Sequence, residues 1–238
     1  MTKIQRTILT AAIVLLPFFA AVPLPAQNLS LVQRLLETRG CPGCDLFGAS
    51  LNRADLFGVD LSGAILSRAD LIDADLTGAD LMAANLNNAN MRNAFLTNAD
   101  ISKANISRAD IRGANLENAN LSESSLREAS LQFTNLKCTN LSASQLSGTD
   151  LRNADLTGAN LSGADLTEAD LTGANLTGVD LRNANLSDAR LIKANLKDAN
   201  LCGARMPNKK TSQRGCPAKK EESESIKINS YCNYCPAL

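Results

Sequence analysis

The stretch NADLTGANLSGADLTEADLTGANL, from Asn153 to Leu176, repeats a small set of residues every five positions. A period of five matches neither the 3.6-residue period of an α-helix nor the two-residue period of a strand. The same step continues without a slip from Leu46 to Met206, which makes 33 pentapeptides. The central residue is Leu in 28 of them, Ile in three and Met in two. A register held over this length predicts a repeat architecture.

Each pentapeptide has an inside and an outside. Two residues before the central Leu stands a small residue, most often Ala, and between them stands Asp or Asn with few exceptions. Residues two apart point to the same side of an extended chain, so Ala and Leu face inward and Asp or Asn faces outward. The last two residues, such as Thr-Gly or Arg-Asn, suit a corner. We predict stacked coils with a core ladder that includes Leu151, Leu156, Leu161, Leu166, Leu171 and Leu176.

The tandem A(D/N)Lxx motif resembles the pentapeptide repeat family, and the resemblance covers residues Cys44 to Asn208. It implies an all-β solenoid, a right-handed four-sided (quadrilateral) β-helix with four pentapeptides per coil. On that geometry the repeats form about eight coils and a rod roughly 40 Å long. Residues 20 apart then form columns. One column would contain Asp60, Asp80, Asp100, Asn120, Asn140, Asn160, Asp180 and Asn200.

The ends of the chain predict export and capping. Residues 1–26 read as a signal peptide, because two basic residues precede an apolar run that is short for a membrane span. An uncleaved anchor is the alternative; after cleavage we expect no stable membrane insertion. Residues 27–43 are expected to hold a capping helix from Ser30 to Arg39, started by a Ser30–Gln33 capping box and stopped at Gly40. Residues 209–238 form a terminal loop and a charged tail that we expect to be disordered.

Seven cysteines accompany this organisation. The segment LCGARMPNKKTSQRGC resembles a recurring terminus of the family, and we predict a disulfide between Cys202 and Cys216 that holds the terminal loop. The C-x-x-C pairs Cys41–Cys44 and Cys232–Cys235 are further disulfide candidates, with a zinc or redox role as the alternative. Cys138 stands alone on a corner, and we expect it to remain a free thiol or to link two molecules.

One stretch departs from the pattern. Between residues 124 and 149, five of the six small inward positions carry a hydroxyl group, which must find a backbone partner in a narrow core. The corners of this stretch include Phe133 and Cys138. Sequence drift in a slightly wider coil is one interpretation. The other is a contact patch formed by Phe133, Cys138, Arg92, Arg112 and Arg152.

The chain has no His, no Trp and a formal net charge of zero. Without His it lacks the commonest general base, and no motif marks catalytic, cofactor-binding or metal-ligating residues. The outward carboxylates could ligate Ca²⁺, but we favour hydrogen bonds to the turns. We therefore predict a non-enzymatic solenoid without a cofactor, acting as a protein-binding or structural scaffold.

The compartment and the partner follow from the same reasoning. The join CPGCDL resembles exported cyanobacterial members, which implies a periplasm or thylakoid lumen. We expect a protein partner, no nucleic acid, and a monomer or weak oligomer. The alternative is DNA mimicry that regulates a topoisomerase, because well-understood relatives bind gyrase through an acidic surface. The freely variable corner positions oppose it, since they hold twelve basic and seven acidic residues.

Overall fold

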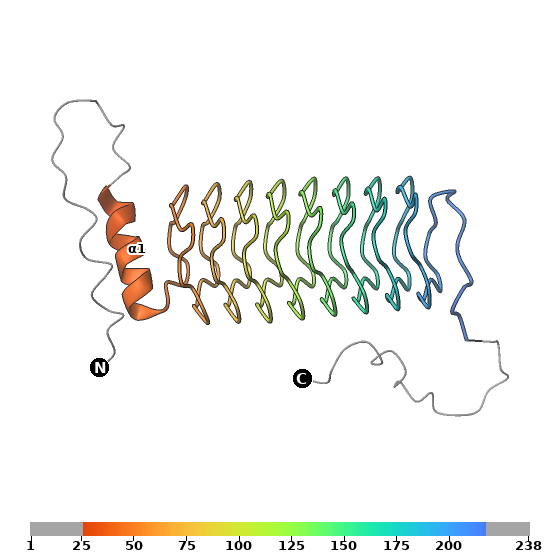
Figure 1. Cartoon of the computed structure of the whole chain (residues 1–238), viewed down its shortest axis with the longest axis horizontal. Helices are drawn as coiled ribbons and strands as arrows, with labels where there is room; N and C mark the ends of the chain where they lie inside the picture. Colours follow the sequence, from red (N-terminus) through yellow and green to blue (C-terminus); the bar gives the residue numbers. More distant parts are fainter. Residues whose placement is uncertain (1–25, 218–238) are drawn as a thin grey trace.

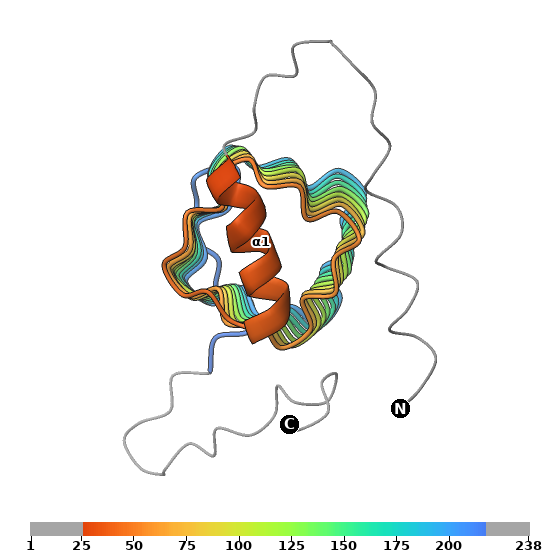
Figure 2. The same ribbon diagram turned by 90° about the vertical axis from the view of Figure 1, so that its left-hand side faces the viewer.

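The computed structural model describes residues 26–217 as a stack of coils with a helix at one end (Figure 1). Isolated parallel bridges join residues 20 apart along the whole stack, from Gly40–Asp60 to Asn185–Arg205. Each coil therefore contains four pentapeptides, and viewed along the axis the coils superimpose as a closed four-sided tube (Figure 2). The predicted β-helix solenoid is confirmed in its period, register and number of sides.

The interior of the tube contains the central and small residues of every repeat. All six leucines of the predicted core ladder, from Leu151 to Leu176, are at most 1% exposed. The alanines two residues earlier, such as Ala154 and Ala159, are equally buried. Each buried Leu contributes roughly 1.5–3 kcal/mol of transfer free energy, so the core is the main favourable term of this fold.

The repeat Asp155–Ala159 shows how five residues satisfy five backbone N–H groups. Leu156 and Gly158 donate to the next coil, at 2.8 and 2.9 Å, and Asp155 donates to the previous coil at 3.0 Å. Ala159 donates across the corner to the carbonyl oxygen of Leu156 at 2.9 Å. The remaining N–H, that of Thr157, donates to the carboxylate oxygen of Asp155 at 3.1 Å. The outward Asp is thus a backbone acceptor, as the sequence predicted.

The predicted column from Asp60 to Asn200 is also linked between coils. Asn120 donates its amide to Asp100 at 3.1 Å, Asn140 to Asn120 at 3.1 Å, and Asn160 to Asn140 at 3.2 Å. Within residues 26–217, no group of three or more Cys, Asp or Glu is placed to hold a metal ion. These short polar side chains hold neighbouring turns and coils together.

Every corner places its second residue at a positive φ, between about 55° and 74° along the coils. Gly and Asn adopt this conformation at little cost, whereas bulky and β-branched residues are strained in it. Accordingly, Val, Ile and Thr are absent from this position in the corners that the structure describes. The corners are thus the most variable part of the outer surface, and one of their two positions is itself restricted.

Helix α1, Ala26–Thr38, lies across the N-terminal end of the tube (Figure 2). Leu35 is fully buried, and Leu31 and Val32 pack against the core. The predicted boundaries were wrong. The helix already begins at Ala26, so Ser30 lies inside it. It ends at Thr38, one residue before the predicted end, and Arg39 follows with a φ of 55°, while Gly40 is the first residue bridged to a coil.

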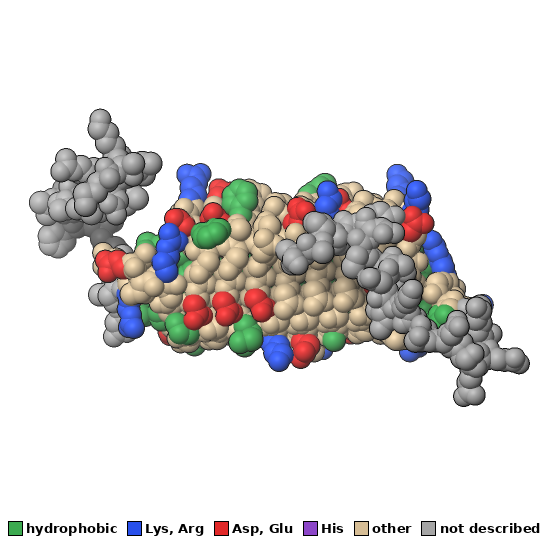
Figure 3. All heavy atoms as spheres, turned by 90° about the horizontal axis from the view of Figure 1, so that it is seen from below, with side chains coloured by type: hydrophobic (Ala, Val, Ile, Leu, Met, Phe, Trp, Pro, Cys, Tyr) green, Lys and Arg blue, Asp and Glu red, His purple; other side chains and the backbone are tan. Residues whose placement is uncertain are grey.

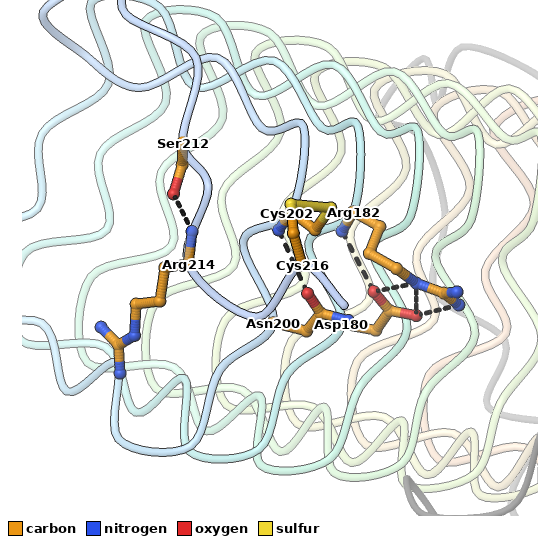
Figure 4. Close-up of a disulfide and its surroundings, with 7 residues drawn as sticks. All are labelled: Asp180, Arg182, Asn200, Cys202, Ser212, Arg214 and Cys216. Carbon is orange, nitrogen blue, oxygen red and sulfur yellow. Dashed lines mark hydrogen bonds and ion pairs between the residues drawn. A yellow bond between two sulfur atoms is a disulfide. The ribbon is translucent and has the colours of Figure 1, made fainter. Parts of the chain in front are cut away.

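The C-terminal end is covered by a loop that a disulfide holds against the last coil (Figure 4). Cys202 and Cys216 are bonded, with their Cα atoms 4.7 Å apart. The returning strand accepts hydrogen bonds from Leu201 and Gly203, both at 3.0 Å, through the carbonyl oxygens of Arg214 and Ser212.

The other cysteines have different surroundings. Cys41 and Cys44 form a second disulfide at the start of the coils, with a Cα–Cα distance of 5.5 Å. Cys138 is also disulfide-bonded. The first of its two predicted states, a free thiol, is therefore wrong, while a link between two molecules stays a prediction. The predicted pair Cys232–Cys235 lies outside the described residues.

Other expectations also fall on segments outside the described residues. The predicted signal peptide, apart from its last residue, and the expected disordered tail after Pro217 belong to them. Within residues 26–217, no helix combines the length and the apolar character that crossing a membrane requires.

The turn carboxylates predict a loss of stability in acid. The hydroxyl and N–H groups of Ser62 hold the pKa of Asp60 below its ordinary value of 3.8, and the guanidinium of Arg112 does so for Asp110. A carboxylate whose pKa is lower in the folded state stabilises the fold at every pH above its unfolded pKa. This stabilisation is lost as the pH falls through the folded-state pKa. The urea midpoint should therefore be nearly constant between about pH 7 and about pH 5 and fall below about pH 4.

The variant Asp60→Asn is the control for this prediction, because Asn retains an acceptor oxygen for the turn but does not titrate. Its midpoint should fall less than that of the wild type over the same acid range. An identical acid dependence of the two proteins would contradict the assigned role of Asp60.

The disulfide at the C-terminal end predicts a second change in stability. Replacing Cys202 and Cys216 together by Ser should lower the free energy of unfolding by about 3 kcal/mol, because the bond closes a loop of intermediate length in the unfolded chain. Urea denaturation under non-reducing conditions measures this. The control is the double variant Cys41→Ala/Cys44→Ala, which opens a much smaller ring and should cost less. Equal losses in the free energy of unfolding of both double variants would contradict this account of the Cys202–Cys216 disulfide.

Candidate functional site

One corner of the tube brings most of the predicted contact patch together. Arg92, Arg112, Gln132 and Arg152 are spaced 20 residues apart, so they occupy the same position on four successive coils, as the neighbouring bridges from Asn90 to Asp150 require. A surface hollow of about 230 Å³ lies in this column. We call it the Phe133 hollow, and it is lined by Arg112, Gln132, Phe133, Arg152 and Asn153.

The predicted patch and the observed hollow overlap only in part. Phe133, Arg112 and Arg152 line the hollow, while Arg92 lies in the same column, one coil before Arg112. Cys138 occupies the next corner of the coil and does not line it. Gln132 and Asn153 were missed, although the 20-residue spacing from Arg112 to Arg152 would have pointed to Gln132.

Each arginine of the hollow is clamped by the carboxylate two residues before it. Arg112 donates to Asp110 from Nε at 2.7 Å and from Nη2 at 2.5 Å. Arg152 makes the same two-pronged contact with Asp150, at 2.8 Å from Nε and 2.6 Å from Nη2. Such bidentate pairs hold the planar guanidinium in a defined orientation. The arginines are therefore fixed in place before any partner arrives.

The clamps also keep the carboxylates ionised. Hydrogen bonds from Arg112 are the largest influence on Asp110 and lower its pKa below 3.8. For Asp150, burial acts in the opposite direction, but hydrogen bonds from Arg152 and Gln132 outweigh it, and its pKa is also lowered. At neutral pH both carboxylates are charged and each balances one arginine. The contribution of these exposed pairs to stability is small because water screens them.

The side chain of Gln132 is only half satisfied. Its Nε2 amide group donates to the carboxylate of Asp150. Its Oε1 atom is buried and has no hydrogen-bond partner, and it is the only such side-chain atom among the residues that the structure describes. A buried acceptor left without a donor costs about 1–3 kcal/mol. This unfavourable feature lies in the wall of the Phe133 hollow.

Phe133 carries a second unfavourable feature. It is 69% exposed and has a φ of 59°. Among the corners that the structure describes, it is the only aromatic residue at positive φ. Elsewhere Gly and Asn commonly fill this position, and a bulky residue in the left-handed region costs about 1 kcal/mol or more. Strain of this kind is concentrated at binding and catalytic sites, which makes Phe133 a candidate contact residue.

The inward hydroxyl groups in the core beneath the hollow are all hydrogen-bonded. All five inward hydroxyl groups donate to backbone carbonyl oxygens at 2.6–3.0 Å, which satisfies the requirement stated from the sequence. Thr134, directly after Phe133, donates to Leu131 at 2.7 Å. These hydrogen bonds thus hold the backbone of the corners in this part of the rod.

Asn153 depends on a glycine in the next coil. Its Oδ1 atom lies 2.5 Å from the position that a Cβ atom would take at Gly173. Any larger residue there would displace the Asn153 side chain, which forms one wall of the hollow. Gly173 is therefore needed both for its positive φ and for this close approach.

A second hollow lies in the same column of corners, four coils nearer the N-terminus. It measures about 320 Å³ and is lined by Asn52, Arg53, Ile72 and Asp73. Its arginine is paired with Asp73 at 3.6 Å, and no aromatic residue lines it. The two hollows show that this corner is concave at more than one point along the rod.

The chemistry available in the Phe133 hollow suits binding. It offers two oriented guanidinium groups, one exposed aromatic ring and two amides, without a nucleophile paired to a base. Cys41 and Cys44 are oxidised to a disulfide at the first coil, so in this state they provide no thiolate for a metal.

Comparison with family models identifies the class of protein. Residues 44–206 match, in five overlapping segments, the model described as pentapeptide repeats. The chain therefore belongs to the pentapeptide repeat family, whose members form right-handed quadrilateral β-helices and are generally non-enzymatic structural or regulatory proteins. A search of curated proteins found no match.

Solved structures of the family resemble the chain to different extents. HetL, a pentapeptide repeat protein involved in heterocyst differentiation regulation from the cyanobacterium Nostoc sp. strain PCC 7120, is 34% identical over 73% of this chain and 89% of its own, with a TM-score of 0.46. A protein from the Arabidopsis thaliana thylakoid lumen is 26% identical over 48% of this chain and 65% of its own, with a TM-score of 0.25. QnrB1, a plasmid-mediated fluoroquinolone resistance protein, is 17% identical over 67% of this chain and 92% of its own, with a TM-score of 0.37.

Phe133 predicts a gain of stability on substitution. Phe133→Asn should raise the free energy of unfolding by about 0.5–1 kcal/mol, because Asn tolerates positive φ and removal of the exposed ring sacrifices little buried apolar surface. The control is Phe57→Asn, which removes an aromatic ring that is 59% exposed at a corner position without positive φ, and which should change stability by less than about 0.5 kcal/mol. Urea denaturation measures both. A lower midpoint for Phe133→Asn would show that the ring supports the fold and would contradict the functional interpretation.

Proposed function

We propose that this protein is an exported, non-enzymatic scaffold that binds a protein partner at the Phe133 hollow, in a periplasm or thylakoid lumen. The observation that carries the proposal is the coincidence, in one hollow, of a strained exposed aromatic residue and an unpaired buried acceptor between two oriented arginines. Both features cost stability in the free protein without helping the fold, which is the pattern expected of a binding surface. We propose a monomer or weak oligomer without a cofactor.

Two disulfides support the assignment to an exported compartment. The bonds Cys41–Cys44 and Cys202–Cys216 close the two ends of the described rod, and disulfides persist in oxidising environments rather than in the cytosol. The proposed signal peptide, residues 1–26, agrees with this compartment.

The distribution of charge favours a protein partner over DNA mimicry. A DNA mimic needs a continuous acidic surface, whereas arginines clamp outward carboxylates here, as in the pairs Arg112–Asp110, Arg152–Asp150 and Arg182–Asp180. On the face shown in Figure 3, acidic and basic side chains lie singly or in short rows among uncharged residues. Carboxylates that accept hydrogen bonds from turns serve the fold and are not arranged as a phosphate backbone.

A comparative pull-down tests this function. The full gene product, expressed with its own leader and purified from the exported fraction, serves as bait for that fraction in three forms: wild type, Phe133→Asn and Phe57→Asn. We expect one or more proteins to be retained by the wild type and the Phe57 variant and to be depleted at least five-fold with the Phe133 variant. Identical retained proteins in all three forms would overturn the proposed site.

A further inference from the structure

We propose that the Phe133 hollow recognises an extended acidic segment of the partner, in which an apolar side chain lies between two carboxylates and the segment runs along the rod axis. The inference rests on the proposed function and adds the chemistry of recognition. It is carried by the unused hydrogen-bonding groups of the arginines, by their spacing, and by the character of the surface between them.

Each clamped arginine has donors left over. Arg112 and Arg152 use Nε and Nη2 on their aspartates, and within the described residues their Nη1 atoms have no acceptor. Arg92, in the same column, makes no side-chain hydrogen bond to any described residue. Guanidinium groups held in place lose little entropy when a carboxylate binds to their remaining edge. The column is therefore preorganised for separate anionic groups.

The spacing of the column matches an extended peptide. Neighbouring coils are about 4.8 Å apart, so Arg112 and Arg152 are separated by about 10 Å along the axis, and Arg92 and Arg152 by about 14 Å. Side chains on one face of an extended peptide follow each other at about 7 Å, and the first and third of them are about 14 Å apart. A pattern of acidic, any, apolar, any, acidic thus places both carboxylates on arginines and the central side chain over the middle of the hollow.

The surface between the arginines fits the middle of such a segment. The ring of Phe133 is 69% exposed and offers an apolar contact to the central side chain. A second hollow lies in the same column of corners, nearer the N-terminus.

The alternation of charge disfavours a nucleic acid. Asp110 and Asp150 remain ionised beside the arginines, and three arginines against two aspartates leave a net charge of only +1 in the column between residues 92 and 152. A continuous phosphate chain would meet these carboxylates, whereas two isolated carboxylates meet only the arginines. A peptide is thus the better match.

The test uses the acetylated and amidated peptide Gly-Glu-Ser-Phe-Ser-Glu-Gly and the full-length protein labelled with ¹⁵N. We expect saturable shifts of the Nε–H signals of Arg92 and Arg152 and of the backbone signals of Gln132, Phe133 and Asn153. Replacing both Glu of the peptide by Gln, or Phe by Ala, should weaken binding at least five-fold. Raising the salt concentration should also weaken it, because charge pairs carry the recognition.

Matched protein variants localise the effect. Arg152→Gln and Arg92→Gln should each weaken peptide binding at least three-fold while the urea midpoint stays nearly unchanged. Arg182→Gln removes an arginine with the same clamp on Asp180, drawn in Figure 4, at a corner outside the hollow. Its peptide affinity should equal that of the wild type.

The outcomes separate this inference from the function on which it rests. The inference is overturned if the peptide does not bind, if Arg152→Gln and Arg182→Gln affect it equally, or if a single-stranded oligothymidine binds the column more tightly than the peptide does. If the pull-down still depends on Phe133 in that case, the docking site stands and only its chemistry is wrong. If the pull-down is independent of Phe133, the proposed function fails whatever the peptide does.

Discussion

The hydrogen bond between the outward Asp or Asn and the backbone N–H two residues later is the interaction on which the rest of this structure depends. In each repeat the coil-to-coil ladder and the corner satisfy four of the five N–H groups, and the fifth points outward, as that of Thr157 does toward Asp155. An acceptor on the preceding outward residue resolves this without a second layer of structure. A single layer of backbone is therefore enough to separate the core of the tube from water.

This constraint leaves few positions free for function. The inward residues must be Leu-like or small, and the outward residue is most often an Asp or Asn that serves the turn, so the two corner residues vary most. One of these has positive φ, which selects against bulky side chains. A residue that breaks this local rule without helping the fold is informative, and Phe133 is such a residue. Its neighbour Gln132 adds an unpaired acceptor at the same place.

The constraint also changes the meaning of the acidic residues. Carboxylates such as Asp110 and Asp150 accept hydrogen bonds from their own turns and hold arginines at the corners, so their number reflects the repeat and not an acidic recognition surface. The arginines, by contrast, have donors to spare. Recognition in this protein therefore depends on which cations and apolar side chains the coils bring together.

The sequence by itself determined the period, the inward and outward faces, the turn role of Asp and Asn, and the need of the inward hydroxyls for backbone partners. It could do so because each repeat obeys a rule set within five residues. The start of α1 at Ala26 and the bonded state of Cys138 were not predicted, since no rule within five residues specifies them. The 20-residue spacing pointed to Gln132, but the tertiary structure alone showed that Asn153 completes the hollow with Phe133. Contacts between residues 20 apart arise only when four sides close a coil, and the orientation of each side chain then depends on its neighbours in the adjacent coils.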